Sequence, residues 1–144
     1  MNVVCVPLII AEKTKPDKDV MLISISEPGE DVNIKFEEWG YPLQLKFHDI
    51  DISTGDVRRV MACNENDLVP FSEDIAKQLI DYVLEHKDKV KGIIVHCHAA
   101  ISRSPAVVKF IKEKILNEDS GKISSLYNRF VFSTLVKTWE KLGK

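Results

Sequence analysis

The feature that most constrains the fold is a continuous apolar run, Gly92–Val95, that leads through a polar turn into an amphipathic segment. A strand that is apolar at every position is buried on both faces, which is typical of parallel sheets covered by helices. Pro105 suits the first turn of the helix that follows. The apolar residues of that segment fall on one side of the helix: Val107, Val108, Ile111 and Ile115. This part of the chain therefore predicts a strand–turn–helix unit.

The remainder of the chain alternates between strand and helix patterns. β-branched or alternating stretches predict three further strands, at Val3–Ile10, Val20–Ser26 and Leu43–His48. Ser72 is expected to be the N-cap of a helix that runs to about His86, and a last helix is expected from about Leu126. Residues 53–70 are polar and predict an irregular loop. This order predicts a three-layer α/β fold in which a central, mostly parallel sheet is flanked by helices.

Length and composition restrict the function classes. The 144 residues fit one domain, expected to span residues 1–144, and a hydrophobic content of 44% argues against disorder. A formal net charge of −2 provides no general attraction to nucleic acid or to anionic membranes, so neither is expected as a partner. The wide spacing of Cys5, Cys63 and Cys97 predicts no disulfide framework. A reducing cytoplasm is the expected location, and nothing predicts the oligomeric state.

Cys97 and Arg103 stand at the two ends of the turn between the buried strand and its helix. In open α/β sheets, ligands bind at this junction, where unpaired N–H groups and the positive end of the helix dipole attract anions. The planar guanidinium of Arg103 can hold two phosphate oxygens. A thiol beside an arginine at a helix N-terminus ionises more readily than a free cysteine. The spacing Cys-x5-Arg, followed by Ser104, therefore predicts an anion site with a cysteine nucleophile.

The stretch "HCHAAISRSPAV" resembles the phosphate-binding loop of the cysteine-based protein tyrosine phosphatases. It is most similar to the compact dual-specificity members and their bacterial and phage relatives, whose loop reads HCxAGxSRS. "LKFHDID" resembles the strand and aspartate that precede a helix in the small bacterial members, and "YNRFVFSTLV" resembles the start of their C-terminal helix. The resemblance implies a tyrosine phosphatase-like fold and a protein-tyrosine or dual-specificity phosphatase. No cofactor and no metal are expected.

The resemblance also implies a role for each matching residue. Cys97 attacks phosphorus and forms a phosphocysteine intermediate, while Ser104 assists the departure of the sulfur. His96 orients the loop, and Asp49 protonates the leaving group. Arg103 and the backbone N–H groups of the loop stabilise the charge of the transition state. The substrate-binding residues are then His98, Ala99, Ala100, Ile101, Ser102 and Arg103.

Two points of this assignment stay open. Ala100 stands where the family usually has glycine, and alanine resists a positive φ, so a distorted loop with phosphate binding but little turnover is the alternative function. The general acid has two further candidates besides Asp49. Asp51 lies two residues on along the strand, and Asp67 lies just before the helix.

Other chemistries for the same loop are less favoured. Zinc binding by His96, Cys97 and His98 would need neighbouring side chains of a strand end to converge, with His48 or Asp49 as a fourth ligand. A rhodanese-type sulfurtransferase normally has a loop one residue shorter, Cys-x4-Arg. These comparisons leave a phosphate ester as the expected ligand.

The substrate is restricted by what the loop lacks. No lysine lies between Cys97 and Arg103, which argues against polyphosphorylated inositol lipids and RNA 5′ ends. A phosphorylated protein is the expected partner, and a small phosphate ester is the other candidate. Cys63 could form a regulatory disulfide with Cys97, although its position also fits an inert thiol.

Overall fold

The computed structural model describes residues 1–51, 56–59 and 68–144. The prediction for Asp67 and Cys63 therefore lies outside the described residues. The elements follow in the order β1 (Asn2–Pro7), α1 (Leu8–Lys13), β2 (Val20–Ser26), η1 (Phe36–Glu38), β3 (Tyr41–Lys46), β4 (Asp49–Asp51), β5 (Asp56–Arg59), α2 (Glu73–His86), η3 (Lys87–Lys89), β6 (Gly92–Cys97), α3 (Arg103–Phe110), η4 (Ile111–Ile115) and α4 (Arg129–Lys141).

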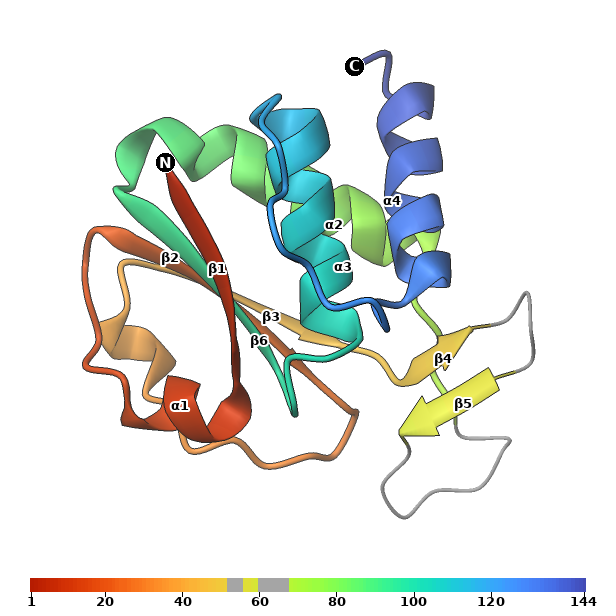
Figure 1. Ribbon diagram of the computed structural model, residues 1–144. Coiled ribbons are helices and arrows are strands. Elements are labelled where there is room, and N and C mark those ends of the chain that lie inside the picture. The colour runs from red at the N-terminus through yellow and green to blue at the C-terminus, as the bar shows by residue number, and fades with distance from the viewer. Residues whose placement is uncertain (52–55, 60–67) are drawn as a thin grey trace.

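The central sheet has four strands in the order β1-β6-β2-β3, and all of its neighbouring strands are parallel. A separate antiparallel pair is formed by β4 and β5. In Figure 1, α2, α3 and α4 lie on one side of the central sheet, and α1 and the short helix η1 lie on the other. The predicted three-layer α/β fold with a parallel sheet flanked by helices is confirmed.

Apolar burial holds these layers together. The larger core lies between the sheet and helices α2, α3 and α4, because alternate strand residues face the apolar sides of these helices. Its fully buried members include Ile23, Val95, Leu79, Val107 and Leu135. On the opposite face of the sheet, Leu22 packs with Trp39 in a smaller cluster. The two central strands, β6 and β2, are therefore covered on both sides, as the continuous apolar run predicted for Gly92–Val95, whereas the edge strands β1 and β3 each keep exposed residues on one face.

The order of the strands decides which residues meet at one edge of the sheet. β6 lies between β1 and β2, so the turn after Cys97 starts in the interior of the sheet rather than at its margin. The residues that follow β3, including Asp49, come to the same carboxyl edge because the strands are parallel. Ligand sites of open α/β sheets form at this edge.

Several predicted boundaries are confirmed by the structure. The strand Val20–Ser26 has the predicted limits. Ser72 caps α2, since its hydroxyl accepts a hydrogen bond from the N–H of Ile75 at 3.2 Å, and α2 ends at His86. These boundaries depend on local patterns, which the sequence displays directly.

Other boundaries were wrong. The first strand ends at Pro7, where Leu8 begins α1 and donates its N–H to the carbonyl of His98 at 3.0 Å. The last helix begins at Arg129, because Asn128 forms its N-cap. The segment 53–70 contains β5 and is not wholly irregular. No helix in the part of the chain described is long and apolar enough to span a membrane.

Candidate active site

The turn between β6 and α3 is here named the cysteine loop, residues 97–103. Its two ends are buried, with Cys97 at 3% exposure and Arg103 at 1%. Ile101, in the middle of the loop, is exposed. The loop therefore encloses its sulfur and its guanidinium and presents its middle to solvent.

The sulfur of Cys97 is held against the first turn of α3. Its Sγ lies 3.1 Å from the hydroxyl oxygen of Ser104 and accepts the Ser104 backbone N–H at 3.5 Å. Ser102 occupies the N-cap position, but its side chain does not cap the helix. The sulfur thus takes the place of a capping side chain, at the end of the helix where a negative charge is stabilised.

The guanidinium of Arg103 makes a hydrogen bond to the protein backbone and also carries a nitrogen without an acceptor among the described residues. Its Nη1 donates to the backbone carbonyl of Phe47 at 2.9 Å, which ties α3 to the end of β3. Its Nε is buried and has no hydrogen-bond partner among the residues described. A buried guanidinium nitrogen without an acceptor is costly, so the arrangement suits an anionic ligand that would accept from it.

The backbone of the cysteine loop offers further donors. Within the part of the chain that the structure describes, no hydrogen bond to a protein acceptor is made by the N–H groups of His98, Ala99, Ala100 and Ile101. Successive unpaired N–H groups at the start of a helix form a concave site for an anion. The loop and Arg103 together can surround one tetrahedral anion next to Cys97.

His96 braces the loop from the opposite side of β6. Its Nδ1 lies 3.3 Å from the carbonyl oxygen of Cys97, and its Nε2 lies 2.6 Å from the hydroxyl of Ser24 on β2. A carbonyl only accepts, so Nδ1 donates, and the Nε2 of the neutral ring accepts the hydroxyl proton. Burial lowers the pKa of His96, which favours this neutral form.

Replacement of His96 by glutamine should flatten the acid dependence of stability. Because burial lowers the pKa of His96 in the folded state, the unfolded chain binds this proton first as the pH falls. The stabilising contribution is complete above about pH 6.5 and is lost progressively below it. We expect the melting temperature of the wild type to drop more than that of His96→Gln between pH 7 and pH 5. Parallel pH profiles for the two proteins would contradict this account.

Asp49 is brought to the cysteine loop by β4. Its carboxyl is 5% exposed, and its Oδ1 accepts hydrogen bonds from the Ser102 hydroxyl at 2.8 Å and from Asn128 Nδ2 at 2.9 Å. Asp51 is also buried, at the end of β4. The structure thus links Asp49, one of the predicted candidates for the general acid, directly to the loop.

Asn128 is a site residue to which the sequence analysis gave no role, although it lies in the stretch "YNRFVFSTLV" that carries the resemblance. It is fully buried, and it contacts both Asp49 and the cysteine loop. The signal that could have found it is local, because asparagine is a favoured N-cap directly before a helical apolar pattern. Its contacts across the fold, by contrast, have no signature in the sequence.

Ala100 adopts the conformation for which glycine would be suited. Its φ is +59°, within the left-handed region that alanine enters at a cost of about 1 to 2 kcal/mol. The cysteine loop therefore keeps its turn with alanine at this position, and the cost appears as backbone strain.

Replacement of Ala100 by glycine should remove this strain. We expect Ala100→Gly to raise the free energy of unfolding by about 0.5 to 1 kcal/mol, the strain relief being partly offset by the greater freedom of glycine in the unfolded chain. Thermal denaturation measures the change. Ala99→Gly is the matched control, since the φ of Ala99 is not positive and glycine there should destabilise the protein. Destabilisation by both variants would contradict the argument.

Two further titratable side chains lie in or next to the loop: His98 belongs to it, and Cys5 lies on the neighbouring strand β1. His98 is exposed, and its Nδ1 lies 3.7 Å from Oε2 of the largely buried Glu30. Burial raises the pKa of Cys5, and the neighbouring Cys97 raises it further, whereas a hydrogen bond with Ser104 acts in the opposite direction. Cys5 is therefore held as a neutral thiol near the sulfur of Cys97.

The structure also bears on the zinc hypothesis. His48 uses its Nδ1 to accept the Val69 N–H at 2.8 Å, and both ring nitrogens of His96 face other protein groups. Among the residues described, no three histidine, cysteine, aspartate or glutamate side chains are grouped so that they could hold a metal ion.

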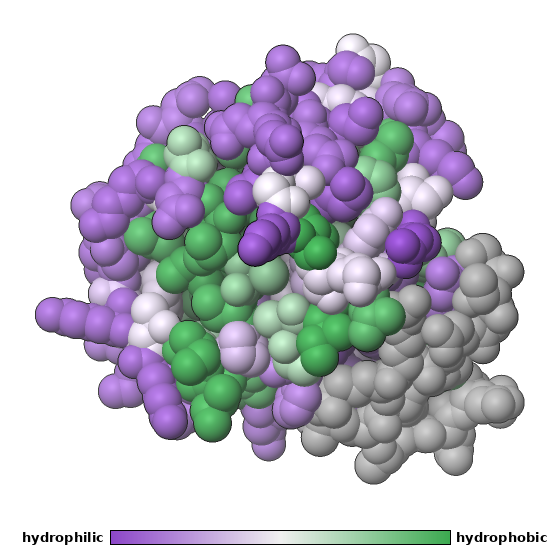
Figure 2. All heavy atoms as spheres, viewed as in Figure 1, coloured by the Kyte–Doolittle hydropathy of each residue, from purple (hydrophilic) through white to green (hydrophobic). Residues whose placement is uncertain are grey.

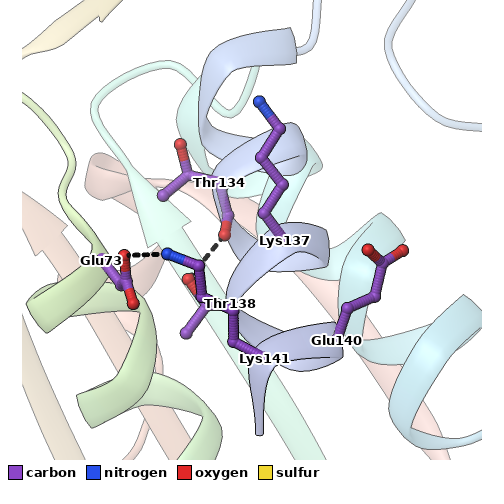
Figure 3. Close-up of a pocket in the computed structure, with 6 residues that line it drawn as sticks. All are labelled: Glu73, Thr134, Lys137, Thr138, Glu140 and Lys141. Carbon is purple, nitrogen blue, oxygen red and sulfur yellow. Dashed lines mark hydrogen bonds and ion pairs between the residues drawn. The ribbon is translucent and has the colours of Figure 1, made fainter. Parts of the chain in front are cut away.

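A surface hollow lies beside the C-terminal half of α4. Figure 3 shows Lys141 directed toward Glu73 of α2, and their side chains form an ion pair of 2.9 Å. Thr138 donates its hydroxyl to the carbonyl of Thr134 within the same hollow. Lys141, Glu73 and Thr138 thus use polar groups of the hollow within the protein, whereas the N–H groups of His98–Ile101 in the cysteine loop have no acceptor among the described residues.

Comparison with known proteins adds no identification. The chain matches no family model, and no curated protein matches it.

Proposed function

We propose that the protein is a phosphomonoester phosphatase that acts through a phosphocysteine intermediate. The observation that carries the proposal is the grouping of Cys97 Sγ with four backbone N–H groups and a buried guanidinium nitrogen, none of which has an acceptor among the described residues. A tetrahedral phosphate satisfies all of these donors with its oxygens, and it places phosphorus next to the sulfur.

In the first step, Cys97 Sγ attacks phosphorus while the bond to the leaving oxygen breaks. Negative charge on the sulfur is stabilised by the Ser104 hydroxyl and N–H and by the N-terminus of α3. The equatorial oxygens receive hydrogen bonds from the cysteine loop and from Arg103. Asp49 donates a proton to the leaving oxygen, which departs as an alcohol or phenol.

In the second step, water attacks the phosphocysteine and releases inorganic phosphate. The Asp49 carboxylate formed in the first step accepts a proton from that water. The departing sulfur again accepts the hydrogen bond of the Ser104 hydroxyl, 3.1 Å away, which favours its release as thiolate. Cys97 is then ready for another cycle.

The surface near the loop favours a phosphoprotein as substrate. Three large exposed apolar side chains belong to the loop or to segments that bond to it: Ile101 in the loop, Ile9 next to Leu8, and Leu126, two residues before Asn128. Figure 2 shows hydrophobic side chains across the middle of the face that bears β1 and α1. Such surroundings suit an aromatic ring and apolar peptide residues better than a sugar phosphate. We propose phosphotyrosine proteins as the principal substrates, in a reducing cytoplasm that keeps Cys97 free.

Hydrolysis of p-nitrophenyl phosphate by the wild-type protein tests the proposal. The assay is run with a metal chelator present, and release of p-nitrophenol should be unaffected by the chelator because no metal takes part. Binding of orthovanadate without measurable hydrolysis would contradict the proposal. That outcome would favour the alternative function, a phosphate-binding protein that is impaired by the strain at Ala100.

A further inference from the structure

We propose that Asn128 is the residue that positions the acid, holding the Asp49 carboxyl in a fixed orientation against the cysteine loop. The inference rests on the proposed phosphatase function and extends it to a residue outside the loop. Asn128 is fully buried between β4, the cysteine loop and α4. It does not contact the sulfur of Cys97, so its role is one of positioning.

The side-chain amide and the backbone N–H of Asn128 all make hydrogen bonds to other residues. The side-chain Nδ2 donates to Asp49 Oδ1 at 2.9 Å and to the carbonyl of Ile50 at 3.0 Å. The side-chain Oδ1 accepts the N–H of Val131 at 3.0 Å and so caps α4. The backbone N–H donates to the carbonyl of Ser102 at 2.9 Å. One residue thereby joins the strand that carries Asp49 to the loop that carries the cysteine.

Ser102 provides a second hydrogen bond to Asp49. Its hydroxyl donates to the same Asp49 Oδ1 at 2.8 Å, so that atom receives one donor from the cysteine loop and one from Asn128. Two donors on one oxygen fix the plane of the carboxyl and leave its Oδ2 to carry the transferable proton. A displacement of about 1 Å in such a group can cost as much as 10²-fold in rate.

Asparagine is well suited to this position. Serine, threonine or aspartate could also cap α4, but these side chains lack an amide that accepts from the helix and donates twice to β4. The chain contains a natural comparison in Ser72, which caps α2 by accepting the Ile75 N–H. This hydrogen bond lies at the start of α2. Replacement of Ser72 is therefore a matched control for the loss of helix-capping energy alone.

Asn128→Ser is the test variant, because serine keeps a capping oxygen while Nδ2 is removed. The kcat for phenyl phosphate, whose leaving group needs a proton, should fall by roughly 10-fold. This is a fraction of the rate factor of about 10²- to 10⁴-fold that general acid catalysis contributes. The kcat for p-nitrophenyl phosphate should fall less than about 3-fold, since its leaving group departs without a proton. Ser72→Ala should change both substrates equally. Equal losses for both substrates in Asn128→Ser would overturn the inference.

A double-mutant cycle on melting temperature separates this inference from the proposed function. Asn128→Ser should lower the melting temperature less in an Asp49→Ala background than in the wild type, because its main partner is already absent. Additive shifts would overturn the inference whether or not the protein hydrolyses phosphate esters. If the shifts were coupled but the protein showed no turnover, the contact between Asn128 and Asp49 would be supported and the proposed phosphatase function would be contradicted.

Discussion

Cys97→Ser is expected to lower the kcat for p-nitrophenyl phosphate by at least about 10⁴-fold, the scale on which removal of an enzymic nucleophile acts. Serine is nearly isosteric and can still pair with Ser104, but its hydroxyl is not ionised near neutral pH. The N–H groups of the cysteine loop and Arg103 are unchanged, so the binding of phosphate should persist. Turnover by steady-state kinetics and phosphate binding by calorimetry measure the two properties separately.

Cys5→Ser is the matched control for this result. Cys5 lies on the neighbouring strand, where burial raises the pKa of its thiol, so it should not supply a nucleophile. Its replacement should leave kcat within a few-fold of the wild type. If Cys97→Ser retained near-normal turnover, the phosphocysteine mechanism would be wrong, and loss of activity in Cys5→Ser alone would move the nucleophile to β1.

Asp49→Asn is expected to slow phenyl phosphate or phosphotyrosine by about 10²- to 10⁴-fold, the range of general acid catalysis. An asparagine side chain keeps an oxygen that can accept from both Ser102 and Asn128, so the change removes the proton while leaving the contacts of Oδ1 in place. p-Nitrophenyl phosphate should be affected much less.

The two other candidate aspartates provide the comparison for the acid. Asp51→Asn and Asp67→Asn should leave both substrates within a few-fold of the wild type. If Asp67→Asn instead showed the dependence on the leaving group and Asp49→Asn did not, the acid would lie on the segment before α2. Asp49 would then serve only to join the cysteine loop to Asn128.

Local patterns were sufficient for the strand–turn–helix unit at the centre of the molecule. The apolar run Gly92–Val95 predicted a strand covered on both faces, and β6 is such a strand. The spacing between Cys97 and Arg103 placed the two residues at opposite ends of one turn, as the structure has them. The possibility of strain at Ala100 was also visible, because φ preference is a property of the single residue.

What the sequence determined by itself is therefore the set of features carried by neighbouring residues: the covered parallel strand, the loop with its cysteine and arginine, and the cap of α2. Tertiary structure alone brought Asp49 into contact with the loop. The bond from Ser102 to Asp49 joins residues 53 positions apart, and that from Asn128 joins residues 79 positions apart. These partners depend on the strand order β1-β6-β2-β3 and on the need of buried polar groups for hydrogen-bond partners. Neither gives a periodic pattern along the chain.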